Sequence, residues 1–297
     1  MTAQDTTLFG TKKTIRCGDR LLSLYEPVVM GILNVTPDSF YSGSRLSAPE
    51  AAAAKATEML AEGAAILDLG GYSSRPGADD ITVQEELNRV LPAIDAILQK
   101  HPDALISIDT FRAEVAQKSV LAGAAIVNDI LGGSLDAEMF ATVAELQVPY
   151  ILMHMRGTPQ TMQQHTDYDN LLLEVTDYFQ QKIAELRALG VKDIILDPGF
   201  GFAKTISLNY ELFRQMQTLQ LFGLPILAGI SRKSMVYKAL GNTPTDALTG
   251  TTALHMAALE RGASILRAHD VKEAVQVVQL FGRLQPQPNP SPVGRVL

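Results

Sequence analysis

Polar and charged side chains stand at the points where eight short apolar runs of the chain stop. They are Asn34, Asp68, Asp109, Asn128, His154, Asp197, Ser231 and Arg267. Carboxylates and amides beside an apolar core suit a flat heterocycle with several N–H donors, because paired hydrogen bonds offset the desolvation of both partners. Arginine suits phosphate, whose oxygens it contacts in a bidentate way. One such polar end would mean little, but eight indicate a fold that gathers polar groups at one rim.

The apolar runs before these residues have the composition of buried strands. They are rich in Val, Ile and Leu on both faces, as parallel strands covered on both sides are. The expected strands lie near residues 28–33, 64–68, 104–109, 125–129, 149–153, 193–197, 225–229 and 264–267. The segments between them have helical patterns: Ser47 and Glu50 match a capping box that opens a helix over 48–62, and apolar residues recur at three- and four-residue spacings over 169–189.

Eight alternating strand and helix units predict an α/β fold, a single (β/α)8 TIM barrel with its active site at the carboxyl ends of the strands. A doubly wound sheet is the alternative, but it would need fewer strands or a second domain, and no linker is evident. Residues 13–24 are expected to form a short N-terminal β-hairpin that turns near Gly18 and Asp19. One domain is therefore predicted over residues 1–284, followed by a proline-rich tail over 285–297.

The composition excludes several classes of protein. A formal charge of −7 argues against nucleic acid or an anionic membrane as the main partner. A single cysteine, Cys17, excludes an internal disulfide framework and a cysteine-based zinc site. No basic start followed by an apolar run marks a secretory signal, and no apolar run is long enough for a membrane helix. A cytoplasmic protein with small-molecule substrates is therefore expected.

The polar strand ends fall into two sets once a barrel is assumed. The set from the middle strands suits a heterocycle and comprises Asp109, Asn128 and Asp197. The set from the first and last strands, which are neighbours in a closed barrel, and from the loop after the second strand suits phosphate; it comprises Asn34, Arg75, Arg267 and His269. Two alternatives stay open here: Asp68 could equally cap a helix, and Arg267 could form a salt bridge at the rim.

The loop after the seventh expected strand, G-I-S-R-K-S-M, is a third element. Ser231 or Arg232 is expected to open a helix, with Lys233 and Ser234 facing the barrel mouth. A ligand carboxylate would suit this place because helix N-termini attract anions; the alternative is an ordinary, basic first turn. The loops over 35–47 and 70–80 are long, polar and rich in Gly, Ser and Pro, which is typical of substrate lids and also of plain surface loops.

Taken together, the segments resemble the dihydropteroate synthase family. The resemblance spans about residues 28–280 and rests on ordered motifs: G-I-L-N-V-T-P-D-S-F, D-L-G-G-Y-S-S-R-P-G-A, I-S-I-D-T, N-D-I, D-P-G-F-G-F-A-K, G-I-S-R-K-S and R-A-H-D. It implies an enzyme that joins 6-hydroxymethyl-7,8-dihydropterin diphosphate to 4-aminobenzoate, forming 7,8-dihydropteroate and diphosphate. The C–O bond to diphosphate would break first, and the amine would capture the resulting pterin methylene cation without a covalent enzyme nucleophile.

The resemblance also implies roles for individual residues. Pterin contacts are expected from Asp109, Asn128, Ile130, Met153, Asp197, Phe202, Gly229 and Lys233. Diphosphate contacts are expected from Asn34, Ser74, Arg75, Arg267 and His269, with Asn34 also binding Mg²⁺. Contacts to 4-aminobenzoate are expected from Phe40, Pro76, Lys233 and Ser234. The residues expected to be catalytic are Asp109, Asp197, Lys233 and Arg267, and the family further implies a homodimer through the outer helices.

Departures from the family pattern lie in two loops, at Tyr41 and Tyr72, and in the expected seventh helix, at Met235. Two rival functions share the pterin-holding barrel: a methyltetrahydrofolate:corrinoid methyltransferase and a pterin-binding protein without catalysis. Neither needs a diphosphate clamp at Asn34 and Arg267 together with the S-R-K turn. That combination favours the synthase.

Overall fold

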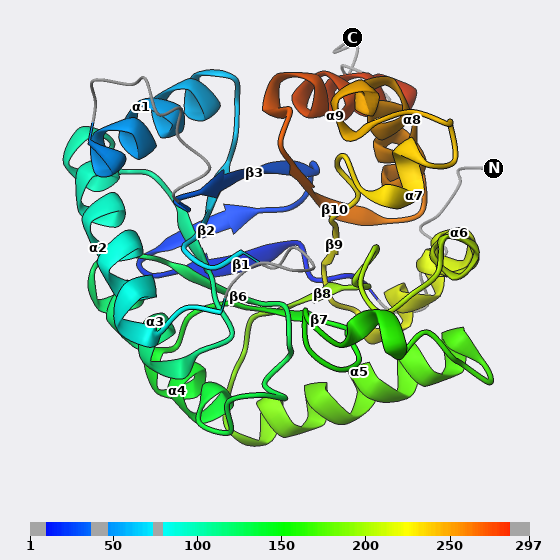
Figure 1. Cartoon of the computed structure of the whole chain (residues 1–297), viewed down its shortest axis with the longest axis horizontal. Coiled ribbons are helices and arrows are strands. Elements are labelled where there is room, and N and C mark those ends of the chain that lie inside the picture. Colours follow the sequence, from blue (N-terminus) through cyan, green and yellow to red (C-terminus); the bar gives the residue numbers. More distant parts are fainter. Residues whose placement is uncertain (1–9, 37–46, 74–79, 286–297) are drawn as a thin grey trace, which may run out of the picture.

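The computed structural model describes residues 10–36, 47–73 and 80–285. Eight parallel strands close into a barrel in the order β10-β3-β4-β5-β6-β7-β8-β9, and helices surround it (Figure 1). A separate two-stranded antiparallel hairpin, β1-β2, precedes the barrel. The predicted (β/α)8 barrel with an N-terminal hairpin is therefore confirmed.

The elements follow the predicted runs closely. The hairpin strands are β1 (Thr14–Cys17) and β2 (Arg20–Ser23). The barrel strands are β3 (Val28–Asn34), β4 (Ile66–Gly70), β5 (Ile106–Asp109), β6 (Ile126–Asp129), β7 (Tyr150–Met153), β8 (Ile194–Asp197), β9 (Ile226–Ala228) and β10 (Ala263–Ala268). The α-helices are α1 (Ala48–Ala61), α2 (Val83–Lys100), α3 (Ala113–Leu121), α4 (Met139–Leu146), α5 (Leu171–Ala188), α6 (Ile206–Gln215), α7 (Ser234–Tyr237), α8 (Leu248–Glu260) and α9 (Val271–Leu284). Short 3₁₀ helices are η2 (Met162–Gln164), η3 (Met216–Phe222) and η4 (Pro244–Asp246).

The barrel interior has an apolar lower layer near the amino ends of the strands. It is made of Met30, Ile66, Ile126, Ile151, Ile195, Leu227 and Ile265. Two residues further along a strand the side chain returns to the same face, because strands have a period of two. On four strands that next inward position is polar or charged: Asp68, Asn128, Asp197 and Arg267. The strand period thus stacks a polar layer directly on an apolar one.

The outward-facing side chains of the strands pack against the helices in one large core. Close packing of β3 shows at Gly31, where an added Cβ would lie 3.0 Å from both the Met59 sulfur of α1 and a Val271 methyl of α9. Helix α1 begins where the capping signal predicts: the Ser47 backbone N–H donates to the Glu50 carboxylate at 2.9 Å. Among the described residues, no helix has the length and apolar character needed to span a membrane.

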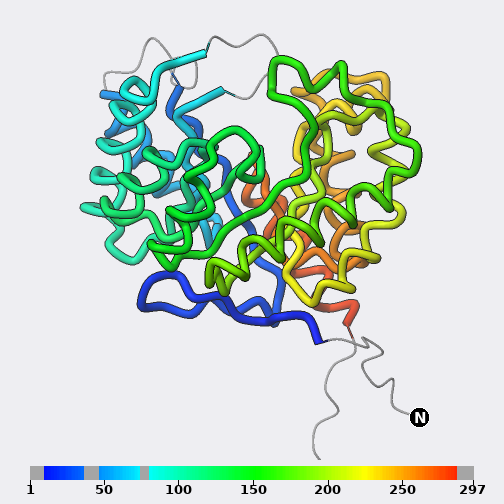
Figure 2. Tube along the Cα trace, turned by 90° about the horizontal axis from the view of Figure 1, so that it is seen from below, coloured from blue at the N-terminus to red at the C-terminus, as the bar shows by residue number. Residues whose placement is uncertain are grey.

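The hairpin closes the amino-terminal end of the barrel (Figure 2). Its Ile15 and Cys17, together with Leu24 just after it, are buried in the same cluster as the lower layer. Hydrogen bonds fix it in place: the Lys12 N–H donates to the Gly223 carbonyl at 3.0 Å, and Arg20 donates to the Asp103 carbonyl at 2.5 Å. The hairpin therefore serves as a plug that keeps water from the apolar layer.

Two boundaries differ from the predictions. Strand β4 continues past Asp68 to Gly70, so Asp68 lies inside the strand and caps no helix. Helix α7 begins at Ser234 with Lys233 as its N-cap, not at Ser231 or Arg232, and it is only four residues long. Arg232 adopts a left-handed backbone conformation, φ +54°, which delays the helix. The proline-rich segment after Gln285 lies outside the described residues.

The plug leads to a prediction about stability. Leu24→Ala removes a side chain that is 2% exposed and should lower the free energy of unfolding by about 2–5 kcal/mol through lost burial and the cavity left behind. Leu21→Ala, in the same hairpin but 72% exposed, is the matched control and should change it by less than about 0.5 kcal/mol. Urea unfolding of both variants measures the difference, and equal effects would contradict the plug.

Candidate active site

A buried arginine joins two carboxylates in the polar layer. Arg267 Nε donates to Asp68 Oδ2 at 2.6 Å, and a terminal nitrogen of the same guanidinium donates to Asp109 Oδ2 at 2.6 Å. These side chains come from β10, β4 and β5, so the contacts cross the barrel interior. Arg267 was predicted in the phosphate set and Asp109 in the heterocycle set. The structure brings the two sets into direct contact.

Asp68 anchors this cluster from the middle of β4. It is fully buried, and its Oδ2 also accepts a hydrogen bond from the Asn128 side-chain amide at 3.0 Å. Its other oxygen, Oδ1, is buried and has no hydrogen-bond partner among the described residues. An unpaired buried acceptor is costly, so a donor from a ligand would be stabilised there. Because β4 continues to Gly70, the period of two puts Ile66 and Asp68 on the same inward face.

Asn34 lies beside the same cluster at the end of β3. A Cβ built on Gly70 would be 3.5 Å from Asn34 Oδ1 and 3.6 Å from the Asp109 Cβ, so these residues flank the bare Cα of Gly70. In the part of the chain that the structure describes, no group of three or more His, Cys, Asp and Glu side chains could hold a metal ion.

Asp197 and Lys233 form a second charged pair on the β8 and β9 side. A Cβ on Gly229 would lie 3.6 Å from both Asp197 Oδ2 and Lys233 Nζ, so the missing side chain leaves space beside both charges. Asp197 Oδ1 accepts from the Gly199 N–H at 2.8 Å. Lys233 Nζ donates to the Phe200 carbonyl at 2.5 Å. Lys233 thus reaches back from the start of α7 into the loop after β8.

An apolar wall stands next to this pair. Its buried members are Phe111, Ile130, Leu131, Met153, Met155, Met162 and Ala203, with Tyr72 and Phe202 packed against them. Three predicted pterin contacts, Ile130, Met153 and Phe202, are therefore in one cluster. The Lys233 ammonium lies 4.5 Å from the centroid of the Phe202 ring, a cation–π distance that joins the wall to the charges.

His269 and Ser231 connect the loops after β9 and β10. Ser231 Oγ lies 3.1 Å from His269 Nδ1 and accepts from the His269 backbone N–H at 3.1 Å. Next to them Arg232 contacts both carboxylate oxygens of Asp270, at 2.9 and 2.7 Å. These paired contacts hold His269 and Lys233 in a fixed relation at one side of the mouth.

Burial shifts the pKa of several groups at the mouth, beginning with Asp109. It raises the pKa of Asp109 to about 7, helped by the Asp68 charge and opposed by Arg267. Burial also raises the pKa of Asp197, against the Lys233 charge, and lowers the pKa of Lys233 to about 8. Burial alone would lower the pKa of Arg267, but the charges of Asp68 and Asp109 outweigh burial and raise it. Arg267 therefore stays charged.

His269 is neutral at pH 7. Burial, and then the Arg267 charge, lower its pKa to about 4. A neutral imidazole can still donate one N–H to an anion.

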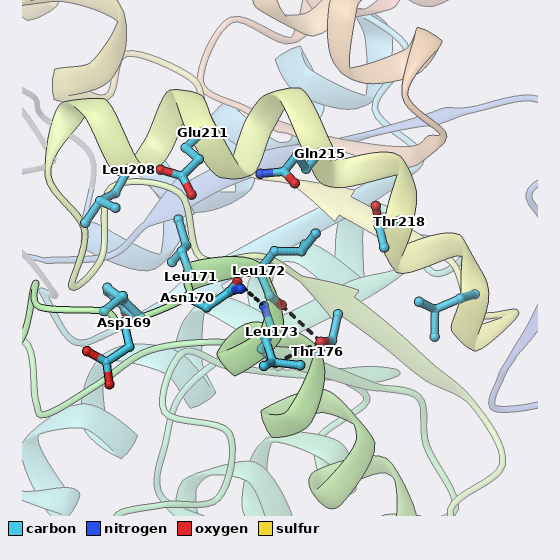
Figure 3. Close-up of a pocket in the computed structure, with 12 residues that line it drawn as sticks. Asp169, Asn170, Leu171, Leu172, Leu173, Thr176, Leu208, Glu211, Gln215 and Thr218 are labelled. Carbon is cyan, nitrogen blue, oxygen red and sulfur yellow. Dashed lines mark hydrogen bonds between the residues drawn. The ribbon is translucent and has the colours of Figure 1, made fainter.

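Four predicted site residues lie outside the described residues: Phe40, Ser74, Arg75 and Pro76. A hollow of about 640 Å³ lies between α5 and α6, and none of the predicted site residues lines it (Figure 3). That hollow is lined by leucines, Asn170 and the acidic Asp169 and Glu211, and it shares no residue with the Arg267 cluster. The candidate active site is therefore the polar layer at the mouth, not this outer groove.

Comparison with known proteins agrees with this geometry. The pterin binding enzyme family matches residues 30–269. A dihydropteroate synthase of Escherichia coli K12 is 44% identical over 261 residues, which are 87% of this chain and 92% of that protein. The chain belongs to the dihydropteroate synthase family. The predicted family is thus confirmed.

Solved structures of the same family superpose on the whole barrel. A Xanthomonas albilineans dihydropteroate synthase with 4-aminobenzoic acid has a TM-score of 0.87 and 37% identity, covering 94% of this chain and 100% of that one. The enzyme from the same organism in complex with 7,8-dihydropteroate has a TM-score of 0.84 and 35% identity, covering 93% and 100%.

The shifted pKa of Asp109 predicts a pH effect on stability. The folded pKa of about 7 exceeds the unfolded value of about 3.9. The folded chain therefore binds this proton more tightly, and the ionised carboxyl costs stability as pH rises from about 4 to 7. Asp109→Asn removes that cost, so its stability relative to wild type should increase by about 1–3 kcal/mol across this range.

Urea unfolding at several pH values between about 4 and 8 measures this. Asp103→Asn, which changes an exposed carboxylate, is the control and should run parallel to wild type. A parallel curve for Asp109→Asn as well would show that Asp109 is not in the buried cluster.

Proposed function

We propose that the chain is a dihydropteroate synthase that condenses 6-hydroxymethyl-7,8-dihydropterin diphosphate with 4-aminobenzoate to give 7,8-dihydropteroate and diphosphate. One observation carries the proposal: a single layer of the barrel holds buried acceptors and, hydrogen-bonded to them, a guanidinium that can meet an anion. The relatives support it, since one Xanthomonas albilineans structure contains 4-aminobenzoic acid and another contains 7,8-dihydropteroate.

The pterin would lie against the apolar wall with its N–H groups toward the carboxylates. Asp197 and Asp109 would accept from the amidine and ring nitrogens, and Asn128, with both a donor and an acceptor, would complete the edge. The wall residues Met153 and Phe202 would cover the ring faces. Ring N–H donors would satisfy acceptors that burial has deprived of water, which makes the pocket specific for a donor-rich heterocycle.

The diphosphate would meet Arg267, His269 and Asn34 at the mouth. Arg267 supplies a fixed positive charge, and the neutral His269 supplies an N–H donor. The amide oxygen of Asn34 is a hard donor of the kind that Mg²⁺ accepts, and Mg²⁺ usually takes few protein ligands when substrate phosphates supply the rest. Asn34 therefore fits as one ligand, and a bound Mg²⁺ would neutralise charge on the departing diphosphate.

The residues then favour C–O cleavage before amine attack. Arg267 stabilises the negative charge that grows on the leaving diphosphate, and the nearby carboxylates of Asp109 and Asp197 stabilise the positive charge that spreads over the pterin. Lys233 and Ser234 would hold 4-aminobenzoate so that its neutral amine attacks the methylene carbon and then loses a proton to water. No step requires a covalent bond to the protein.

The oligomeric state is proposed from the family resemblance, and the location from the sequence. A homodimer through the outer helices and a cytoplasmic location stay predictions, as do the contacts from Phe40, Ser74, Arg75 and Pro76. The corrinoid methyltransferase alternative is disfavoured because it transfers a methyl group and has no diphosphate to bind at Arg267. A non-catalytic pterin-binding protein would not need the diphosphate contacts and the 4-aminobenzoate contacts together.

The proposed reaction can be tested by diphosphate release. With Mg²⁺ and both substrates, diphosphate and 7,8-dihydropteroate should form in equal amounts, while either substrate alone should give no dihydropteroate. Diphosphate and dihydropteroate are quantified in the same samples. Pterin bound without any turnover would favour the non-catalytic alternative, and methyl transfer from methyltetrahydrofolate would favour the methyltransferase.

The shared position of Lys233 predicts a double defect. Lys233→Met removes the charge beside Asp197 and the donor to the Phe200 carbonyl, so KM should rise at least tenfold, or about 1.4 kcal/mol, for both substrates. Lys238→Met, which alters an exposed lysine just after α7, should leave both KM values within twofold. A defect in only one KM would contradict the placement of Lys233 between the two substrates.

A further inference from the structure

A second lysine, Lys204, is buried behind the site with no role in the reaction described above. Its side chain is 4% exposed and lies in the loop between β8 and α6. Its ammonium reaches the Gly199 carbonyl at 3.1 Å, the Phe202 carbonyl at 3.2 Å and the His154 carbonyl at 3.5 Å. His154 Nδ1 lies 3.0 Å from it. One cation thus gathers acceptors from two loops.

The partners of Lys204 are unusual for a buried charge. Among the described residues they are three carbonyls and an imidazole nitrogen, and none is a carboxylate. Burial keeps His154 neutral by lowering its pKa, so its Nδ1 can accept from the ammonium. The His154 ring is held edge-on to Tyr178, with centroids 5.0 Å apart. Burial lowers the pKa of Lys204 to about 7, against the Asp197 charge. Because burying an ammonium costs free energy, these hydrogen bonds offset a cost that an apolar side chain would not have.

What they hold is the conformation of the loop itself. Its Phe202 N–H donates to the Gly199 carbonyl at 3.2 Å, closing a turn, and Ala203 has a left-handed φ of +46°. The carbonyls of Gly199 and Phe202, which both belong to this turn, converge on Lys204. Turn carbonyls that point at one another repel, and an ammonium between them removes the repulsion.

The same loop forms one side of the pterin pocket proposed above. The Gly199 N–H donates to Asp197, and the Phe200 carbonyl accepts from Lys233. The Phe202 ring belongs to the apolar wall and lies under the Lys233 ammonium. These contacts with the site all come from residues 199–202, whose first and last carbonyls are the ones that Lys204 binds.

We propose that Lys204 is a positioning residue: its buried ammonium, acting as a fixed N–H donor to the Gly199, Phe202 and His154 acceptors, holds the Phe202 ring and the Phe200 carbonyl where the pterin and Lys233 need them. Lys204 touches neither substrate and acts through the loop. This inference rests on the proposed dihydropteroate synthase reaction.

The first experiment compares Lys204→Met with Lys192→Met, an exposed lysine just before β8, in steady-state assays with both substrates. Lys204→Met should raise KM for the pterin diphosphate at least tenfold. The factor by which KM for 4-aminobenzoate rises should be at least five times smaller. Lys192→Met should match wild type. An unchanged pterin KM in Lys204→Met, or equal changes for the two substrates, would overturn the proposal.

The second experiment separates N–H donation from the filling of space. Lys204→Ala leaves a cavity lined by the four acceptor atoms, so propylammonium in the assay should lower the raised pterin KM by at least threefold. Tetramethylammonium, which has the charge but no N–H, and propanol, which is neutral, should not. Equal rescue by all three, or by none, would overturn the role of Lys204 as a charged N–H donor.

Stability and wild-type activity are measured alongside. Should Lys204→Met fail to fold, Lys204→Gln, which keeps an N–H₂ group without charge, replaces it and should show a pterin KM raised about threefold. Loss of fold in both would overturn the proposal, because the residue would then serve the whole structure. Absence of dihydropteroate formation by wild type would instead refute the proposed function, which keeps the two failures distinct.

Discussion

The contact of Arg267 with Asp68 and Asp109 is the interaction on which the candidate site depends. Three charged groups inside a barrel are tolerable only because their hydrogen bonds are short and directional, at 2.6 Å each for the two pairs. Without Arg267 the two carboxylates would repel each other at low dielectric, and the pKa of Asp109 would rise further. With it, both are held in place and a guanidinium is fixed in the centre of the mouth before any ligand binds.

The rest of the barrel makes such a charged layer possible. The layer below is apolar on seven of the strands, with the buried Ser107 on β5, and the hairpin seals it with Ile15, Cys17 and Leu24. Water can therefore reach the charges from the mouth alone, and each charge must find its partner within the layer or in a ligand. The unpaired Oδ1 of Asp68 and the raised pKa of Asp109 show that the described residues do not satisfy the layer completely.

Much of this was predictable because strand ends and periodicity are local signals. Buried runs that end in polar residues predicted the eight strands and their shared rim, and Asp109, Asn128, Asp197 and Arg267 are in that layer. The sequence left open whether Asp68 caps a helix, because a polar residue near the end of an apolar run fits a helix cap and an inward-facing strand position equally well. Only the structure, in which β4 extends to Gly70, shows that Asp68 lies inside the strand and faces inward.

Contacts between loops that are distant in the chain could not be predicted from the sequence. The start of α7 at Ser234 depends on Arg232, whose left-handed backbone is stabilised by its pairing with Asp270, 38 residues away. Likewise no pattern in G-F-G-F-A-K distinguishes Lys204 from a surface lysine, because its partners include His154 from another loop. Such positions are set by tertiary hydrogen bonds, which spacing along the chain does not encode.

The contact between Arg267 and Asp109 bears directly on the proposed chemistry. Sequence reasoning assigned one to the diphosphate and the other to the pterin, as separate halves. In the structure they are hydrogen-bonded, so the two ends of the breaking C–O bond would face a bonded pair of opposite charge. As the diphosphate leaves, negative charge grows toward Arg267 and positive charge toward Asp109, each beside its complement and without rearrangement of either side chain. The ion pair at the barrel mouth is thus already oriented for charge separation in its ligand.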